Sequence, residues 1–522
     1  MHDMRDGAVI GYSGDRSHFV APNLVSAFQN PQAVSTYLSN ECIEGRMAGP
    51  YTHLPHADLR CSGVGVVPKK SGKLRLIMHL SAPQGTSIND GISQDEFSLH
   101  YMTVDDAVRL LHRHGKGALL SKVDLRNAFR LCPVAPSDWP LLGIHWDNAF
   151  YVDKFLPFGL RSSPFLFNRL ADALCWVATN RFNVHDLLHY LDDFLTVQPP
   201  QPPNHARRQF HTLLAVMEHL QVPLAEGPDK VCPPSTTVTF LGIELDSQAW
   251  EMRLPAPKLL ELKSTLDSWV HRVQCTKREL LSLAGSLSFA AKVVPPGRTF
   301  CRRLFDEASQ FTSLDSTQRL NQEALNDISW WHACIESWNG RSLLLDPSWC
   351  KPTEMQLFTD ASDRGYGLVC GKEWAYGQWE ALHKDLSIEW RELFPIALIC
   401  VTLGKRLRNR RLLVHCDNEA VCTIWRTGTS RCPEIMTLVR IALLAAAKHN
   451  MVVFLAHIRG VDNVLADRLS RLQVESFRKL HPQASPVPMS LEVRQLTRLL
   501  TTPWASSLRE WQQVPPGRML PV

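Results

Sequence analysis

The chain has 522 residues, which is enough for about three or four domains of ordinary size. Hydrophobic residues make up 45% and charged residues 20%, which excludes an intrinsically disordered protein, and 27 glycines without a three-residue period exclude collagen. Lysine and arginine total 56 against 51 aspartates and glutamates. The resulting net charge of +5 permits a nucleic-acid partner but does not by itself demonstrate one.

Cysteine usage and hydropathy bear on where the protein works. The 14 cysteines include no Cys-x-x-Cys pair, which is typical of reduced thiols and not of a disulfide framework or a zinc site. The longest apolar runs, 393–403 and 441–447, are shorter than the roughly 20 residues that cross a bilayer. No apolar core follows the first residues, so no signal peptide is predicted. We expect an intracellular protein, in the cytoplasm or the nucleus, with no membrane partner and no secretion.

The first half of the chain mixes strands and helices. Residues 25–38 predict a helix within a polar N-terminal extension. Residues 63–78 read as a hairpin with a basic tip, and residues 118–123 as a short strand that ends at Asp124. A helix over 164–177 precedes a second hairpin, 184–197, which carries Asp192 and Asp193 at its turn.

The second half is first helical and then alternating. Residues 259–273 and 278–293 predict amphipathic helices, and 311–352 a tryptophan-bearing helical spacer. From residue 355, strands at 355–358, 412–415 and 451–456 alternate with helices at 389–403, 418–425 and 434–447, as in an α/β domain. A proline-containing tail holds one helix, 491–500. The predicted segments are 1–55, 56–250, 251–310, 311–352, 353–472 and 473–522.

A first set of carboxylates is carried by the apolar runs of segment 56–250. One aspartate after an apolar run is more often a turn or a cap, so Asp124 alone would indicate little. Adjacent aspartates such as Asp192 and Asp193, held against an apolar sheet, repel each other unless cations neutralise them, and carboxylate oxygens suit Mg²⁺.

The order of these motifs resembles the reverse transcriptase family. The resemblance rests on Asp124, the Tyr-x-Asp-Asp box that ends at Asp193, the Leu-Pro-Phe-Gly turn at 156–159 and the Phe-Leu-Gly turn at 240–242. It implies an α+β right-hand polymerase, with fingers and palm over 56–250 and a helical thumb over 251–310. It also implies that Asp124, Leu125, Asp192 and Asp193 hold two Mg²⁺ ions, with Mn²⁺ as an alternative, that serve nucleotidyl transfer.

The same resemblance implies a site for deoxynucleoside triphosphates. Its basic residues would grip the phosphates, Phe129 would exclude a 2′-hydroxyl group, and Gly159 would lie under the base. A lone lysine such as Lys230 is otherwise more often a solvated surface residue, and Phe158 stands where retroviral enzymes carry glutamine. The implied nucleotide-binding residues are Lys70, Lys73, Arg75, Arg126, Asn127, Ala128, Phe129, Gly159 and Lys230.

A second set of acids resembles the ribonuclease H family over 353–472. Each acid alone has an ordinary reading as a strand end, helix face or cap, but together the spacings fit that family's four-acid plan. The resemblance implies an α/β ribonuclease H-like domain that holds two metal ions and cleaves the RNA of RNA–DNA hybrids, with His457 assisting proton movement. Asp462 is a rival for the last position. The implied catalytic and metal-binding acids are Asp360, Glu392, Asp417 and Asp467.

The two resemblances together predict an enzyme that copies RNA into DNA and then removes the template. The expected partners are an RNA template, a DNA primer, RNA–DNA hybrids and deoxynucleoside triphosphates; the oligomeric state is left open. Residues 281–298 look most like those of DIRS-type retrotransposons, whose polyproteins add a tyrosine recombinase, and the tail would be the start of a linker toward such a domain.

Three alternatives stay open at this point. The chain could be a domesticated or inactive nucleic-acid-binding derivative, although all the expected acids are present. It could be an RNA polymerase that copies RNA, but Phe129 and the second acid set argue against this alternative. The second acid set could belong to a DNA-strand transposase, because that fold is shared.

Overall fold

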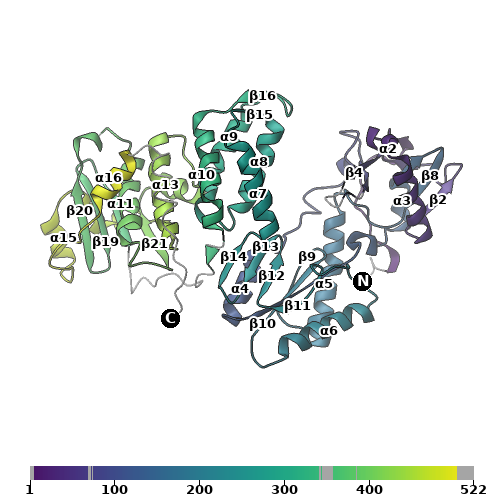
Figure 1. Ribbon diagram of the computed structural model, residues 1–522, viewed down its shortest axis with the longest axis horizontal. Coiled ribbons are helices and arrows are strands. Elements are labelled where there is room, and N and C mark those ends of the chain that lie inside the picture. Colours follow the sequence, from purple (N-terminus) through teal and green to yellow (C-terminus); the bar gives the residue numbers. More distant parts are fainter. Residues whose placement is uncertain are drawn as a thin grey trace. The chain divides into compact units, whose positions relative to one another are not determined.

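The computed structural model describes residues 5–68, 72, 74–339, 342–343, 357–383 and 385–501 of the chain (Figure 1). The chain forms two compact units, Met1–Leu241 and Gly242–Val522. Lys70 and Lys73 lie outside the described residues, as do most of 340–356 and all of 502–522. Among the described residues, every helix is too short or too polar to cross a lipid bilayer.

The N-terminal segment of the first unit contributes strands to a five-stranded sheet. Asp147 and Asn148 take positive φ angles of 49° and 56° in the tight turn between two of its strands, as a two-residue hairpin turn requires. Two helices accompany this sheet, α2 (Val25–Gln29) and α3 (Pro31–Ile43), where the sequence predicted one. In order across the sheet, the strands are β1 (Phe19–Val20), β3 (Arg60–Cys61), β7 (Gly143–Trp146), β8 (Ala149–Asp153) and β2 (Met47–Tyr51).

A buried ionic network ties α3 to the rest of this unit. The guanidinium group of Arg130 lies 2.7 Å from carboxylate oxygens of both Glu41 and Asp153. Burial alone would raise the pKa of Glu41, but hydrogen bonds from Arg46 and the charge of Arg130 lower it below its usual value. The N-terminal segment is therefore held by charge pairing as well as by sheet pairing.

The predicted basic hairpin is confirmed as β4 (Val64–Pro68) and β5 (Leu74–Met78), and Arg75 pairs with Val67 across it. The predicted second hairpin is also confirmed, as β9 (Leu187–Tyr190) and β10 (Asp193–Gln198), and lies at one edge of a four-stranded antiparallel sheet. In order, the strands of that sheet are β11 (Val231–Ser235), β6 (Leu119–Asp124), β10 and β9.

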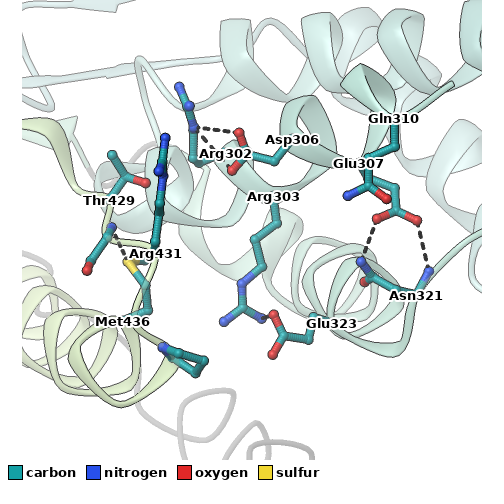
Figure 2. A pocket seen from close by; sticks show the side chains of 12 residues that line it. Arg302, Arg303, Asp306, Glu307, Gln310, Asn321, Glu323, Thr429, Arg431 and Met436 are labelled. Atoms are coloured by element: carbon teal, nitrogen blue, oxygen red, sulfur yellow. Dashed lines mark hydrogen bonds and ion pairs between the residues drawn. The ribbon is translucent and has the colours of Figure 1, made fainter. Parts of the chain in front are cut away.

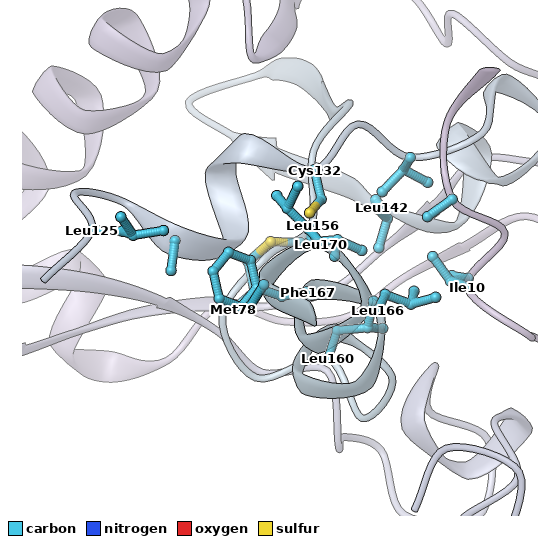
Figure 3. Close-up of a cluster of buried hydrophobic side chains, with 14 of the residues drawn as sticks. Ile10, Met78, Leu125, Cys132, Leu142, Leu156, Leu160, Leu166, Phe167 and Leu170 are labelled. Atoms are coloured by element: carbon cyan, nitrogen blue, oxygen red, sulfur yellow. The ribbon is translucent and has the colours of Figure 1, made fainter. Parts of the chain in front are cut away.

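Helices cover the central sheet and complete one hydrophobic core. The core extends from Ile10 near the N-terminus to Leu125 after β6 and Phe167 in the longest helix (Figure 3). These three side chains are at most 2% exposed, so residues far apart in sequence share one interior. The remaining elements of this unit are α4 (Val104–His114), α5 (Ser163–Phe182), α6 (His205–His219), β12 (Thr237–Phe240), η1 (Asn89–Gly91), η2 (Ala128–Leu131) and η3 (Pro136–Leu141).

The second unit begins with a helical part. The helices predicted over 259–273 and 278–293 are confirmed as α7 (Ala256–Trp269) and α8 (Lys277–Ala290). A capping box starts α8, because Thr276 and Glu279 satisfy each other's backbone N–H groups. The other elements here are η4 (Pro295–Phe300), α9 (Arg302–Ser309), α10 (Gln322–Trp338), β13 (Ile243–Asp246), β14 (Glu251–Arg253), β15 (Gln274–Thr276), β16 (Thr317–Arg319) and β17 (Ser342–Leu343).

The second unit ends with a five-stranded mixed sheet and its helices. The sequence predicted three of the strands, β18 (Leu357–Ala361), β21 (Arg411–Cys416) and β22 (Val452–His457), which run parallel to one another. It did not predict β19 (Gly365–Cys370) and β20 (Glu373–Gln378), which extend the sheet antiparallel beyond β18. The helices are α11 (Ile388–Leu403), α12 (Glu419–Thr427), α13 (Pro433–Lys448), α14 (Val464–Ser470), α15 (Val474–Leu480), α16 (Val493–Thr501), η5 (Ala381–His383) and η6 (Gly460–Asp462).

The helical part and the α/β part of this unit pack on each other through a buried ion pair. Arg440 in α13 donates to Asp327 in α10 at 2.8 Å and to the carbonyl oxygen of Thr299 at 3.2 Å. Its guanidinium group also lies over the Phe300 ring, 4.7 Å from the centroid, and Phe300 stacks on Trp330 at 3.9 Å. The junction therefore combines charge pairing with aromatic packing.

A polar cleft of about 520 Å³ lies beside this junction (Figure 2). Arg302 pairs with Asp306 and Arg303 pairs with Glu323, each at 3.0 Å. Glu307 accepts hydrogen bonds from the backbone and side chain of Asn321. The acidic side chains of the cleft are thus matched by donors of the cleft itself.

Candidate active sites

The first set of aspartates meets at the end of the central sheet. Asp124 ends β6 and pairs directly with Asp193 at the start of β10. Tyr190 pairs with Asp193 across the hairpin, so Leu191 and Asp192 form its two-residue turn, and Leu191 takes a φ of 51° there. The N–H of Leu125 donates to the carbonyl oxygen of Asp192 at 2.9 Å. The sheet register therefore brings together the residues predicted to hold metal ions in segment 56–250.

These carboxylates are crowded and partly buried. Burial raises the pKa of Asp193 to about 6, and the charges of Asp124 and Asp192 act in the same direction. Burial also raises the pKa of Asp192, with a further contribution from Asp124. Two cations oppose this repulsion: Lys230 donates to Asp124 at 2.7 Å, and the Lys122 ammonium group lies 3.6 Å from Asp193.

The donor set fits divalent cations. Carboxylate oxygens are the hard ligands that Mg²⁺ and Mn²⁺ prefer. The Oδ1 atom of Asp193 is buried and has no hydrogen-bond partner within the part of the chain that the structure describes. The Lys122 ammonium group lies 3.6 Å from this oxygen, beyond hydrogen-bond distance, so a bound divalent cation would supply a direct contact that the described residues do not.

Some of the predicted nucleotide-binding residues lie together. The Arg75 guanidinium group lies 4.2 Å from the centroid of the Phe158 ring, and that ring lies 5.0 Å from the Phe129 ring. Lys230 contacts Asp124 and is therefore not an isolated surface lysine. Gly159 takes a φ of 95°, which favours glycine, and its carbonyl oxygen accepts from Asn89.

Residues 126–128, which were predicted to bind the nucleotide, form a turn that leads into a short helix. Asn127 takes a left-handed φ of 57° and starts the short helix η2, in which Ala128 is buried. The Arg126 side chain lies 3.7 Å from exposed Glu226. No hydrogen bond or ion pair within the described residues joins the Arg126 side chain to the three aspartates.

The four acids of the second set line one cavity of about 430 Å³ in the α/β part. Asp360 lies in the central strand β18, and Asp417 directly follows the neighbouring parallel strand β21. Glu392 comes from α11 and Asp467 from α14. The rival Asp462 does not line the cavity; it forms an exposed ion pair with Arg459.

Crowding and burial raise the pKa values of acids in this second site as well. Burial raises the pKa of Glu392 to about 9, and the charges of Asp360 and Asp417 add to the shift; its side chain is 4% exposed. Burial likewise raises the pKa of Asp360 to about 7, with contributions from Asp417 and Asp467. Carboxyl groups held this close at neutral pH fit a divalent cation, which would compensate their charges.

His457 lies at the rim of the second site. It ends β22 opposite Cys416 of β21, and its Nε2 atom lies 3.2 Å from the carbonyl oxygen of Asp417. The side chain is exposed, so it faces solvent next to the acids.

Several charged or aromatic residues, at the two sites and in the helical part, were not predicted from the sequence. Lys122 stands two residues before Asp124 on the same strand, and the two-residue period of a strand was a signal for it. Arg471 donates to Asp467 at 2.6 Å, one helical turn further along. In the helical part, Lys258 and Lys292 lie over the Phe289 ring, 4.2 and 5.3 Å from its centroid, and no local pattern indicates that cluster.

One family model matches the part of the chain that carries the first set of aspartates. Residues 67–245 match the family described as reverse transcriptase (RNA-dependent DNA polymerase). These residues, about a third of the chain, are similar to reverse transcriptases. The match includes all three aspartates of the central sheet, Arg75, Phe129 and Lys230.

Viral proteins are among the relatives of the chain. Protein P of heron hepatitis B virus is 29% identical over 145 residues, which are 28% of this chain and 18% of that protein. Polyprotein P3 of Commelina yellow mottle virus is 21% identical over 420 residues, 77% of this chain and 20% of the polyprotein. The chain thus spans about a fifth of the length of the curated relatives it matches.

Solved structures of the foamy viral protease-reverse transcriptase share the fold. One, of the form dRH in complex with double-stranded DNA, has a TM-score of 0.50 at 15% identity and covers 86% of this chain and 73% of the other. A second complex with double-stranded DNA has the same TM-score and identity and covers 85% and 86%. The chain thus shares the α+β right-hand polymerase fold of these structures, and its last part is the mixed sheet with its helices described above.

Proposed function

We propose that this chain is an RNA-directed DNA polymerase that copies retroelement RNA into DNA by two-metal nucleotidyl transfer and also cleaves the RNA strand of RNA–DNA hybrids. One observation carries the proposal. The part of the chain that is similar to reverse transcriptases places Asp124 opposite Asp193 across two paired strands, with Asp192 in the adjoining turn.

In the polymerase site, the chain's own residues would hold and orient the reactants. Asp124, Asp192 and Asp193, with the backbone beside Leu125, would hold two Mg²⁺ ions. When bound, these ions activate the primer 3′-hydroxyl group and stabilise the leaving pyrophosphate. Lys230, which is paired with Asp124 in the structure, would contact a phosphate oxygen of the nucleotide.

The nucleotide would be selected by residues next to these acids. Arg75 would offer donors for the triphosphate, as would Lys70 and Lys73, which lie outside the described residues, and Gly159 would lie under the base. The Phe129 ring would clash with a 2′-hydroxyl group and so favour deoxynucleotides. The adjoining 126–128 stretch would line the nucleotide site through its backbone.

In the second site, Asp360, Glu392, Asp417 and Asp467 would hold two metal ions at the phosphodiester of the RNA strand. Such ions supply an activated water and stabilise the leaving oxygen. His457, exposed beside Asp417, would take or deliver a proton at the rim. Arg471 orients Asp467 through their 2.6 Å hydrogen bond.

The wider assignment rests on the resemblances. The boundaries 1–55, 56–250, 251–310, 311–352, 353–472 and 473–522, an intracellular location and a DIRS-type element are our proposals. The expected partners are an RNA template, a DNA primer, hybrids and deoxynucleoside triphosphates. The foamy viral complexes with double-stranded DNA support a duplex partner for this fold.

A single assay tests both activities. A labelled primer is extended on a poly(rA) template with Mg²⁺, and degradation of the RNA strand is followed in the same tube. We expect Asp192→Asn to lose extension and keep RNA degradation, and Asp360→Asn to do the reverse. Hybrid binding by the wild type without either reaction would instead support an inactive nucleic-acid-binding derivative.

A further inference from the structure

Two cysteines flank Asp417 in the sequence, at the point where β21 ends and α12 begins. Cys416 is the last residue of β21 and is fully buried, whereas Cys422, near the start of α12, is half-buried. Both are free thiols in the structure, and the two thiol groups are hydrogen-bonded to each other. Only residues 417–421 separate them along the chain. The second site therefore has a pair of thiols in contact beside one of its acids.

The short segment between the two thiols is held at both ends. The Asn418 side chain accepts from the backbone N–H of Val421 at 3.1 Å and so caps α12. The N–H of Cys422 donates to the carbonyl oxygen of Asn418, also at 3.1 Å. Because β21 fixes one end of the segment and the capped helix fixes the other, a shift of either cysteine would be passed on to Asp417 between them.

Cys416 also contacts the acids of the second site. Its Sγ atom lies 4.0 Å from Oε2 of Glu392. One carboxylate oxygen of Glu392, one of Asp417 and this sulfur atom all lie within 4.8 Å of one another. Non-bonded heavy atoms sit about 3.5–4.0 Å apart, whereas the sulfur atoms of a disulfide are about 2.05 Å apart. A bond between the two thiols would therefore draw the sulfur atoms together by more than about 1 Å and disturb the acids next to Cys416.

We propose that Cys416 and Cys422 are a site of reversible oxidation, and that the disulfide between them inactivates the second site by displacing Asp417 and Glu392. The oxidant is hydrogen peroxide. Its O–O bond breaks as the Cys422 sulfur takes one oxygen and becomes a sulfenic acid, and one water is released. The Cys416 sulfur then attacks the Cys422 sulfur, and the hydroxyl group leaves with the Cys416 proton as a second water. A dithiol reductant returns the two electrons and two protons.

This inference rests on the proposed hybrid cleavage and deepens it, because it gives that site a regulation by oxidants. The acids beside the two thiols belong to the second unit of the chain, whereas the polymerase aspartates belong to the first. We therefore expect oxidation to stop hybrid cleavage and to leave primer extension unchanged. An oxidised chain would go on making RNA–DNA hybrid without removing its RNA strand.

The first test compares hybrid cleavage by the full chain before and after treatment with hydrogen peroxide. We expect the cleavage rate to fall at least about tenfold, because a misplacement of about 1 Å in an active site can cost about 100-fold. Dithiothreitol should restore the rate. Cys422→Ser should cleave at the wild-type rate and lose the sensitivity to peroxide. Equal losses in the wild type and in Cys422→Ser would overturn the inference.

The matched control is Cys432→Ser. Cys432 is half-buried like Cys422 and lies in the same α/β part, but its thiol contacts the carboxylate of Glu434 at 2.9 Å. The substitution is chemically identical, so this variant should stay as sensitive to peroxide as the wild type. A loss of sensitivity in Cys432→Ser would show that another thiol is responsible and would also overturn the inference.

Two measurements that do not depend on cleavage separate this inference from the proposed function. The tryptic peptide 412–426 contains both cysteines, so in the treated wild type mass spectrometry should find it lighter by the two hydrogen atoms that oxidation removes. Equilibrium dialysis with Mn²⁺ should show fewer bound ions after treatment of the wild type and no change for Cys422→Ser.

The two failures have different signatures. A wild type that cleaves no hybrid, but forms the disulfide and loses bound Mn²⁺, would refute hybrid cleavage and support the inference. Absence of the disulfide after treatment would overturn the inference. A disulfide that leaves both the cleavage rate and the bound Mn²⁺ unchanged would overturn it as well.

Discussion

At the scale of single residues, the buried ion pairs are the interactions whose loss we expect to lower the free energy of unfolding most. Arg130 is held between Glu41 and Asp153, all three being buried, and it joins α3 to β8. We expect Arg130→Met to lower the free energy of unfolding by about 3–5 kcal/mol, because two carboxylates would be left in the interior without their partner. Urea denaturation followed by tryptophan fluorescence measures this.

The control for that substitution is Arg46→Met. Arg46 also pairs with Glu41, but it lies nearer the surface, and Arg130 remains to compensate the carboxylate. A loss of about 1 kcal/mol is expected, since the remaining pair still satisfies Glu41. Equal losses for the two variants would contradict the account of a network centred on Arg130.

The last acid of the proposed ribonuclease H-like site can be assigned by a pair of isosteric substitutions. Asp467 lines the cavity with the other three acids, whereas Asp462 pairs with Arg459 outside it. We expect Asp467→Asn to lower the rate of hybrid cleavage by at least about 100-fold, because a metal ligand is lost. Asp462→Asn should cleave within about twofold of the wild type. The opposite ranking in a gel assay of labelled hybrid would reverse the assignment.

At the scale of elements, the start of α8 offers a defined test. Thr276 accepts from the backbone N–H of Glu279, and Glu279 accepts from the backbone N–H of Thr276 at 2.8 Å. We expect Thr276→Ala to cost about 1 kcal/mol in the free energy of unfolding, because one end of α8 loses its cap.

The pH dependence of this cap has a definite sign. The backbone hydrogen bond from Thr276, followed by the one from Arg272, lowers the pKa of Glu279 to about 2. A lowered folded-state pKa gives stability that is present above the ordinary value and lost as the pH falls through the folded value. The difference in urea midpoint between the wild type and Glu279→Gln should therefore be equal at pH 7 and pH 6 and smaller at pH 3. A difference that grows on acidification would contradict it.

Lys258 in α7, Phe289 in α8 and Lys292, which follows the end of α8, form a cluster that we expect to contact a duplex backbone. Lys292→Gln should weaken binding of an RNA–DNA duplex and reduce the slope of log Kd against log salt by about one, because one phosphate contact is removed. Lys263→Gln is the control, since Lys263 in α7 is paired with Glu336 at 2.7 Å. Filter binding at several salt concentrations measures the slope. An unchanged slope for Lys292→Gln would exclude a phosphate contact there.

At the scale of the whole molecule, the sequence predicted local elements better than distant pairings. The hairpin that carries Asp192 and Asp193 has apolar strands on both sides of its turn, so its position was readable. The strand β19 contains Gly365 and Gly367, which weaken a strand signal, and Gly367 is needed because a Cβ there would meet Ala466 of α14 at 2.6 Å. Its antiparallel pairing was therefore missed.

The N-terminal segment is a second case in which the sequence did not predict the strand pairing. Strand β1 has two residues and β2 contains Gly49 and Pro50, so neither has the alternation that predicts a strand. Their partners lie far along the chain, and sequence patterns carry little information on such pairing. The acids of both sites were predicted because motif order supplied what local pattern did not. The stack of Arg75 on Phe158 needed the structure, because two remote elements make it.

The packing between the helical part and the α/β part of the second unit can be tested by mutation. Its helical and α/β parts meet at the pair of Arg440 and Asp327, both buried, with Phe300 packed on the guanidinium group. Burial raises the pKa of Asp327 to about 6, even though the charge of Arg440 acts against that shift. We expect Arg440→Leu to cost about 3–5 kcal/mol, because an uncompensated carboxylate would remain in the junction.

Loss of this pair should also separate the two parts during unfolding. Calorimetry of Arg440→Leu should show two resolved transitions where the wild type shows a larger cooperative one, since the parts would no longer stabilise each other. The double variant Arg440→Leu with Asp327→Leu should recover much of the loss, because apolar side chains of similar volume can replace a buried ion pair. If the double variant is no more stable than Arg440→Leu, the stranded carboxylate is not the cause and the aromatic packing around Phe300 carries the junction instead.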